Sequence, residues 1–118
     1  MSEGRLRQTM LLDFYGELLT EKQRLCFDLH YNEDLSLTEI AEQCGISRQG
    51  VWETIRRAEK AMEDVEAKTG LIRRFEENRA ALEKLREELK ALAAMTEGRA
   101  REAAVKAVGE IEAVIARG

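Results

Sequence analysis

The segment "SRQGVWETIRRAEK" (47–60) holds the side chains of this sequence best suited to chemistry, namely hydrogen bonding to a nucleic acid. Arg48 has the planar donor fork that pairs with guanine N7 and O6, and Gln49 can pair with adenine in the same way. Arg56, Arg57 and Lys60 are cations that suit phosphate oxygens. The candidate nucleic-acid-binding residues are therefore Ser47, Arg48, Gln49, Trp52, Glu53, Arg56, Arg57 and Lys60.

These side chains need a helix to present them, and the residues around them predict a helix, a turn and a second helix over 36–60. Ser36 with Glu39 three residues later has the pattern of a capping box. Gly45 stands where a helix end requires a positive φ, and Ile46 can plug the turn. A helix-turn-helix also needs a small residue where the two helices cross, and Ala41 stands there. The second helix must bury an apolar stripe, and Val51 and Ile55 belong to it.

The alternative for the same segment is an ordinary solvated helix face, in which Glu53 pairs with Arg57 four residues later. Charge bears on this choice, because residues 1–70 contain nine Lys or Arg against 14 Asp or Glu, whereas residues 71–118 contain ten against nine. Domains that bind DNA strongly are usually basic. We therefore expect a protein partner, or a nucleic acid held by several subunits at once.

The whole chain predicts helices, so the expected fold class is all-α. There is no proline, 36% of the residues are charged, and β-branched alternation is short. We expect a helix-turn-helix domain over 1–70, then a long helix and a C-terminal helical hairpin within 71–118. The predicted helices cover residues 5–16, 20–31, 36–44, 48–68, 71–95 and 100–116, with a turn at "TEGR" (96–99).

Two apolar sets follow from helical spacing. The expected core of the first domain comprises Phe14, Leu18, Leu25, Leu29, Ile40, Ile46, Val51 and Ile55. The long helix carries a heptad stripe that the short, Ala-rich last helix can cover only in part, so we expect a homodimer. Its predicted interface consists of Leu82, Leu85, Leu89 and Leu92.

Residues 11–75 resemble the YlxM family of bacterial helix-turn-helix proteins, through "LLDFYG", "LLTEKQ", "LSLTEIAE" and "GISRQGV". That family is similar to region 4 of sigma factors, which reads the −35 promoter element, and residues 47–57 correspond to its reading helix. Trp52 and the acidic surroundings depart from strongly basic sigma readers. The resemblance implies a regulatory or accessory role in the signal recognition particle pathway, because the family's gene lies beside those of the particle protein and its receptor.

Other classes of function find little support. His30 is the single histidine and stands at a helix end, and no metal-ligand cluster or phosphate-binding glycine loop is evident. We therefore expect no enzyme, catalytic residue, metal, cofactor or small-molecule substrate. Cys26 and Cys44 are expected to be buried hydrophobes. With no signal peptide or membrane span, the predicted location is the cytoplasm.

The leading hypothesis is a non-enzymatic helix-turn-helix binding or regulatory protein whose partner is DNA, RNA or a component of the signal recognition particle. The alternative is a helical assembly protein, in which the helix-turn-helix serves only as a scaffold for contacts between proteins.

Overall fold

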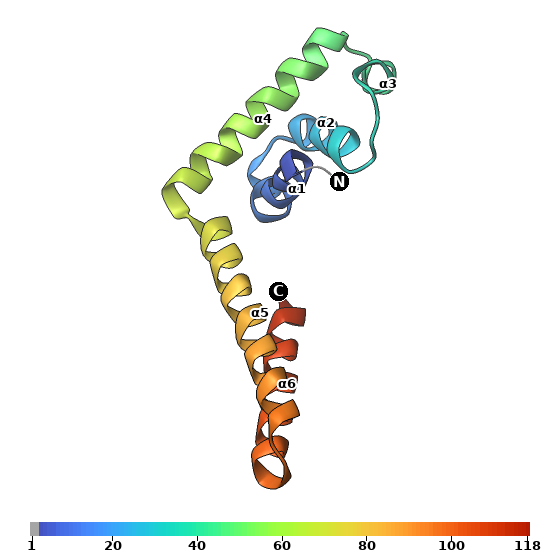
Figure 1. Cartoon of the computed structure of the whole chain (residues 1–118). Coiled ribbons are helices and arrows are strands. Elements are labelled where there is room, and N and C mark those ends of the chain that lie inside the picture. Colours follow the sequence, from blue (N-terminus) through green and yellow to red (C-terminus); the bar gives the residue numbers. More distant parts are fainter. Residues whose placement is uncertain (1–2) are drawn as a thin grey trace. The chain divides into compact units, whose positions relative to one another are not determined.

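The computed structural model describes residues 3–118, and within this range it contains six α-helices, one short 3-10 helix and no strand (Figure 1). The prediction of an all-α fold is therefore confirmed. The chain divides into two compact units, one ending at Ile72 and one covering Arg73–Gly118. The elements are α1 (Glu3–Tyr15), η1 (Gly16–Leu18), α2 (Glu21–Tyr31), α3 (Leu37–Cys44), α4 (Arg48–Thr69), α5 (Leu71–Met95) and α6 (Gly98–Arg117).

Capping boxes set the starts of α2 and α3, and that of α3 is the predicted pair of Ser36 with Glu39. Thr20 Oγ1 accepts the backbone N–H of Gln23, and the Gln23 side chain accepts the N–H of Thr20, both at 3.1 Å. Ser36 and Glu39 form the same reciprocal pair at 3.0 and 3.1 Å. Each box satisfies two N–H groups that lack a partner inside the helix.

The turn between α2 and α3 depends on an aspartate in the left-handed region. Asp34 has φ of 62°, a conformation that Asp tolerates better than most residues. Its carboxylate pairs with the Arg5 guanidinium of α1, and Arg5 also donates from Nε to the Tyr31 carbonyl at 3.0 Å. His30 donates from Nδ1 to the Leu35 carbonyl at 3.0 Å, so the single histidine has a structural contact at this turn.

The first unit packs around α4, which contacts α1, α2 and α3. The buried stripe of α4 consists of Val51, Ile55, Ala58 and Met62, which are fully buried at spacings of four, three and four, and the half-buried Val65 continues it. The other buried hydrophobic residues of this unit are Leu11, Leu12, Tyr15, Cys26, Phe27, Ile40 and Ile72.

The core prediction was wrong for three residues. Phe14, Leu18 and Leu25 are 38%, 68% and 50% exposed, whereas Ile40, Val51 and Ile55 are fully buried and Leu29 and Ile46 are half-buried. The cause lies in α1 and α2, where neighbouring apolar residues such as "MLLDFY" surround much of the helix. Periodicity alone then does not determine which side packs inward. The structure turns Leu11 and Tyr15 inward on α1, and Cys26 and Phe27 inward on α2.

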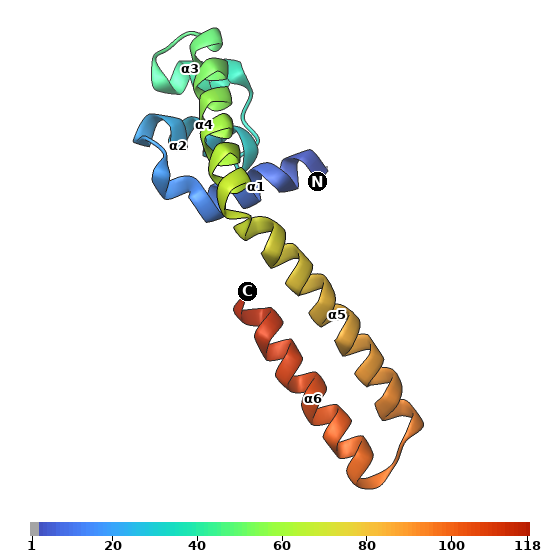
Figure 2. The same ribbon diagram turned by 90° about the vertical axis from the view of Figure 1, so that its left-hand side faces the viewer.

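In the second unit, α5 and α6 lie side by side and antiparallel, as both views show (Figures 1 and 2). The chain reverses between Met95 and Gly98, where Gly98 takes φ of 63°, within the predicted "TEGR" turn. Among the residues described in this unit, only Ala104 is buried. Within residues 3–118 no helix is long and apolar enough to cross a membrane.

Candidate nucleic-acid interface

The turn that precedes α4 has the geometry of a helix-turn-helix. Gly45 adopts φ of 67°, and its N–H donates to the Ala41 carbonyl at 2.9 Å. Ile46 follows, half-buried, with its N–H 3.3 Å from the same carbonyl. Residue 45 therefore requires conformational freedom that glycine has, since other residues rarely adopt this region.

Ser47 caps α4 by accepting the Gly50 N–H on its Oγ at 2.9 Å. A Cβ at position 50 would lie 3.1 Å from that Oγ, a tight contact, although Gln23 and Glu39 occupy the same third position in the capped helices α2 and α3. A glycine at this position also permits the close backbone approach to a ligand.

The candidate residues of α4 share the exposed side of the helix. The buried stripe occupies the opposite side and leaves Arg48, Gln49, Trp52, Glu53, Arg56, Arg57 and Lys60 exposed, together with the cap Ser47. The pair of Glu53 with Arg57, which belonged to the alternative of an ordinary solvated helix face, is not formed; Gln49 instead donates from Nε2 to Glu53 at 3.4 Å. Lys60 pairs with Asp64 at 3.1 Å, with both side chains more than half exposed, so solvent keeps this pair weak.

Arg48, Arg56 and Arg57 form no side-chain hydrogen bond or ion pair with any residue in the range 3–118. Three guanidinium groups on one helix face would normally attract neighbouring carboxylates, and α4 has several. Glu59, Glu63 and Glu66 bind partners on other helices, whereas Glu53 and Asp64 stay on the exposed side. The exposed start of α4 is therefore more basic than the composition of residues 1–70 suggests.

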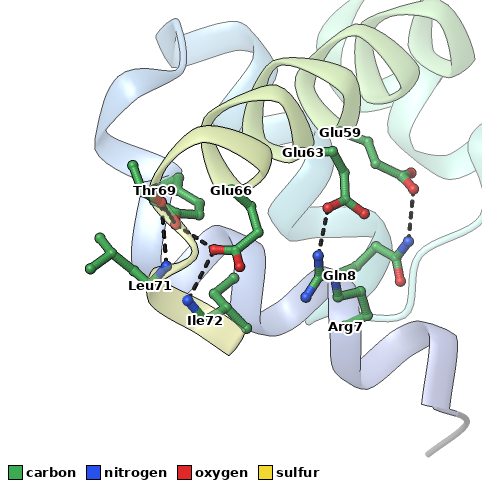
Figure 3. Close-up of polar contacts among 9 residues, drawn as sticks. Arg7, Gln8, Glu59, Glu63, Glu66, Thr69, Leu71 and Ile72 are labelled. Carbon is green, nitrogen blue, oxygen red and sulfur yellow. Dashed lines mark hydrogen bonds and ion pairs between the residues drawn. The ribbon is translucent and has the colours of Figure 1, made fainter. Parts of the chain in front are cut away.

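Two of these carboxylates bind side chains of α1 (Figure 3). Arg7 donates from Nη2 to Glu63 at 2.7 Å, and Gln8 donates from Nε2 to Glu59 at 2.9 Å. Glu59 and Glu63 lie on α4 beside its buried stripe. Sequence reasoning missed these contacts, although the helical spacing of Glu59, Glu63 and Glu66 on one side of α4 was a usable signal.

A shallow apolar hollow of 410 Å³ lies at the exposed start of α4, lined by Leu37, Arg48, Gln49 and Trp52. Trp52 is 42% exposed, so part of its ring is open to solvent in this hollow. A flat indole beside a guanidinium offers a stacking surface for a nucleobase or a contact for a thymine methyl group. The structure thus brings Trp52 together with Arg48 and Gln49.

The two cysteines belong to α2 and α3, the helices that pack against α4. Cys26 is fully buried, as expected, and Cys44 is half-buried at the end of α3. Burial raises the pKa of the Cys26 thiol, and the neighbouring Cys44 raises it further. Burial and the neighbouring Cys44 therefore both favour the protonated, unreactive form of Cys26. Residues 3–118 contain no group of three or more His, Cys, Asp or Glu side chains arranged to hold a metal.

Comparison with known proteins gives one consistent result. Residues 2–101 match the sequence model of a family described as "UPF0122: Putative helix-turn-helix protein, YlxM / p13 like". The UPF0122 protein of Thermoanaerobacter sp. (strain X514) is 48% identical over 86 residues, which are 73% of this chain and 74% of that protein. The UPF0122 protein of Geobacillus kaustophilus is 47% identical over 87 residues, or 74% of this chain and 79% of the relative. That of Halalkalibacterium halodurans is 45% identical over 87 residues, covering 74% and 80%.

Proposed function

The chain belongs to the UPF0122 family of YlxM-like helix-turn-helix proteins, and on this premise we propose that it is a non-enzymatic regulatory protein that binds nucleic acid through the start of α4. Arg56, Arg57 and Lys60 contact phosphates, while Arg48 and Gln49 reach base edges. Ser47, Trp52 and Glu53 complete the contact surface.

One observation carries this proposal: Arg48, Arg56 and Arg57 are exposed and without side-chain partners among residues 3–118, although the unit that holds them is acidic. Other exposed arginines, such as Arg24 and Arg99, also lack an ion pair within residues 3–118; what distinguishes these three is that they share one side of a helix. Here Arg7 neutralises Glu63, and the exposed side of α4 carries four cations, Arg48, Arg56, Arg57 and Lys60, against the carboxylates of Glu53 and Asp64, so this side keeps a local positive charge. Positive charge of this kind is what phosphate recognition requires.

The physiological setting that the family resemblance supports is an accessory or regulatory role in the signal recognition particle pathway. Within that setting, the RNA of the particle and promoter DNA are the two nucleic acids to compare. The proposed partners are therefore RNA or DNA, together with components of the particle, and the proposed location is the cytoplasm.

The test measures binding of the whole chain to labelled duplex DNA and to the particle's RNA, by fluorescence anisotropy at about 50 and 200 mM salt. The double variant Arg56→Ala, Arg57→Ala should weaken binding to every sequence and reduce the slope of log K against log salt by about two. The matched control is Arg99→Ala, Arg101→Ala, which removes two exposed cations from α6 and should leave the slope unchanged. Equal binding by both double variants would reject α4 as the contact surface.

A second function, assembly of two copies, is favoured by the arrangement of apolar residues on the hairpin. A hollow between α5 and α6 is lined by Phe75, Asn78, Arg79, Leu82, Val114, Ile115 and Gly118. The half-buried apolar residues of the hairpin at helical spacing, Phe75, Leu82, Leu89, Ile111 and Ile115, mark the facing rows of the two helices. On both helices, the residues three positions after a facing residue lie on the same side of the hairpin. They include Leu85, Leu92 and Val114, whose side chains are 47%, 47% and 40% exposed.

Residues one position after the facing rows lie on the other side of the hairpin, and they are mostly charged: Glu76, Glu83, Lys90 and Glu112, with Val105. One side of the hairpin is thus apolar and the other polar. We propose that the apolar sides of two copies pack together as a four-helix arrangement, with Leu85 and Leu92 at its centre and Leu82 and Leu89 at its edge. Such a dimer carries two reading helices, which raises the avidity for nucleic acid.

A further inference from the structure

A groove of about 710 Å³ runs along α1, η1 and α2, on a surface that includes none of the candidate residues of α4. Its apolar part is formed by Leu12, Phe14 and Leu25. Phe14 and Leu25 are two of the residues that sequence periodicity predicted for the core. They are instead 38% and 50% exposed on the outside of the unit. Large apolar side chains gathered in an open groove commonly mark a binding surface.

Charged side chains border the same groove. Four carboxylates line it, against the single guanidinium of Arg24; the carboxylates are those of Asp13, Glu17, Glu21 and Asp28. Asp28 accepts a hydrogen bond from Asn32 Nδ2 at 2.6 Å. Among residues 3–118, no hydrogen bond or ion pair engages the side chains of Asp13, Glu17 or Glu21. The groove therefore combines an apolar floor with a negative border.

This combination excludes several ligands by charge. Nucleic acids and anionic membrane surfaces would be repelled by the carboxylates, and a second copy of the chain would bring the same negative border against this one. A cation without apolar surface would leave Phe14 and Leu25 exposed to water. The ligand that satisfies both features has positive side chains that flank an apolar ridge.

We infer that this groove binds a cationic amphipathic helix of a partner protein. The spacing of the α2 residues supports a helical ligand: Glu21, Leu25, Asp28 and Asn32 are separated by four, three and four positions, so they form one row along α2. The row extends about 17 Å at 1.5 Å per residue, close to three turns of a bound helix. Apolar anchors at i, i+4 and i+7 enter the groove beside Phe14, and Lys or Arg residues on either side meet the carboxylates.

The probe is a synthetic fluorescein-labelled peptide of about 18 residues, built from Leu at i, i+3, i+4 and i+7 spacing with Lys elsewhere. Two control peptides accompany it: a scrambled sequence of the same composition, and one in which Glu replaces Lys. The full-length chain should bind the first peptide saturably and more weakly as salt rises, because salt screens the charges. The scrambled peptide should bind about tenfold more weakly, since it cannot present an apolar ridge.

Matched variants of the chain locate the contact. The triple variant Asp13→Asn, Glu17→Gln, Glu21→Gln should lose about tenfold or more in affinity, whereas Glu76→Gln, Glu88→Gln, Glu110→Gln, which neutralises three exposed carboxylates of the hairpin, should bind as the wild type does. Leu25→Ser should weaken binding, and Val105→Ser should not. These four variants change exposed side chains, and their circular dichroism spectra check that they stay folded.

The inference is overturned if the peptide does not saturate the chain, if the scrambled peptide binds equally well, or if the α1–α2 triple variant keeps full affinity. The Arg56→Ala, Arg57→Ala variant separates this groove from the nucleic-acid surface, because it should retain peptide binding whatever it does to DNA or RNA binding. Loss of peptide binding in that variant would also count against the groove.

Discussion

The hydroxyl group of Tyr15 donates a hydrogen bond to the Glu66 carboxylate over 2.5 Å and so connects α1 to the last turns of α4. The same carboxylate oxygen accepts the backbone N–H of Ile72, in the first turn of α5, at 2.9 Å (Figure 3). Thr69 Oγ1 lies 2.6 Å from the Tyr15 hydroxyl. Glu66 is 7% exposed, and a carboxyl group so buried needs such partners. The Glu66 carboxylate also satisfies the N–H of Ile72, which has no partner within α5.

Replacing Tyr15 by Phe should lower the free energy of unfolding by about 1–3 kcal/mol, because Glu66 then stays buried with one donor fewer. Urea denaturation followed by circular dichroism measures this. Tyr31→Phe is the matched control, since Tyr31 is half-buried and its described contacts are made by its ring and its backbone carbonyl. Equal losses in the two variants would mean that the hydroxyl contact with Glu66 contributes little.

Alkaline pH should destabilise the protein, and Tyr15 should account for part of the effect. Burial, and then the hydrogen bond with Glu66, raises the pKa of Tyr15 above its ordinary value of 10.0. The unfolded chain therefore releases this proton at a lower pH than the folded chain does. The contribution of the Tyr15 hydroxyl to the free energy of unfolding is fully present below about pH 10. Above that pH it falls, by at most about 1.4 kcal/mol per pH unit for one such group. Tyr15→Phe should make the decline shallower, as denaturation at pH values on both sides of 10 will measure. Burial raises the pKa of Tyr31 too, so a smaller decline should remain in that variant.

The corrected core assignment predicts unequal costs for similar truncations. Ile55→Ala removes a fully buried side chain from the stripe of α4 and should cost about 2–5 kcal/mol. Leu18→Ala shortens a side chain that is 68% exposed and should cost less than about 1 kcal/mol. Shifts in the midpoint of urea denaturation give both values. A large loss at Leu18 would contradict its place outside the core.

Trp52 is the only tryptophan of the chain, so its fluorescence reports directly on the candidate interface. If a nucleobase stacks on the indole, titration with nucleic acid should quench this emission. Trp52→Ala should weaken binding by about 1–3 kcal/mol, the usual contribution of one stacked base. Binding seen by anisotropy without any change in Trp52 emission would place the ligand elsewhere.

Self-association through the hairpin predicts a sedimentation mass of twice the 13.4 kDa chain at low micromolar concentration. The double variant Leu85→Asp, Leu92→Asp should sediment as a monomer, whereas Val105→Asp, on the charged side of the hairpin, should stay dimeric. Mixing the aspartate variant with Leu85→Lys, Leu92→Lys should restore the doubled mass if positions 85 and 92 of one copy meet those of the other across a two-fold axis. A wild-type chain at the monomer mass would reject the dimer.

Local chemistry allowed the sequence alone to predict where helices begin and end. The capping pair of Ser36 with Glu39 and the positive φ of Gly45 involve residues at most a few positions apart. Their geometry depends little on the rest of the fold. The stripe of α4 was equally predictable, because its apolar residues lie on a single side. The family was recognisable from the same segments.

Only the tertiary structure decided which sides of α1 and α2 face inward. Apolar residues surround these helices, so packing against α4 selects Tyr15 and Phe27 for the core and leaves Phe14 and Leu25 outside. The polar partners were also beyond the sequence, since Arg7 and Glu63 are separated by 56 positions and meet only once α1 lies on α4. For the same reason a count of charges along the chain could not show which cations stay unpaired on the exposed side of α4. Pairing across helices, rather than composition, determines which charges stay exposed.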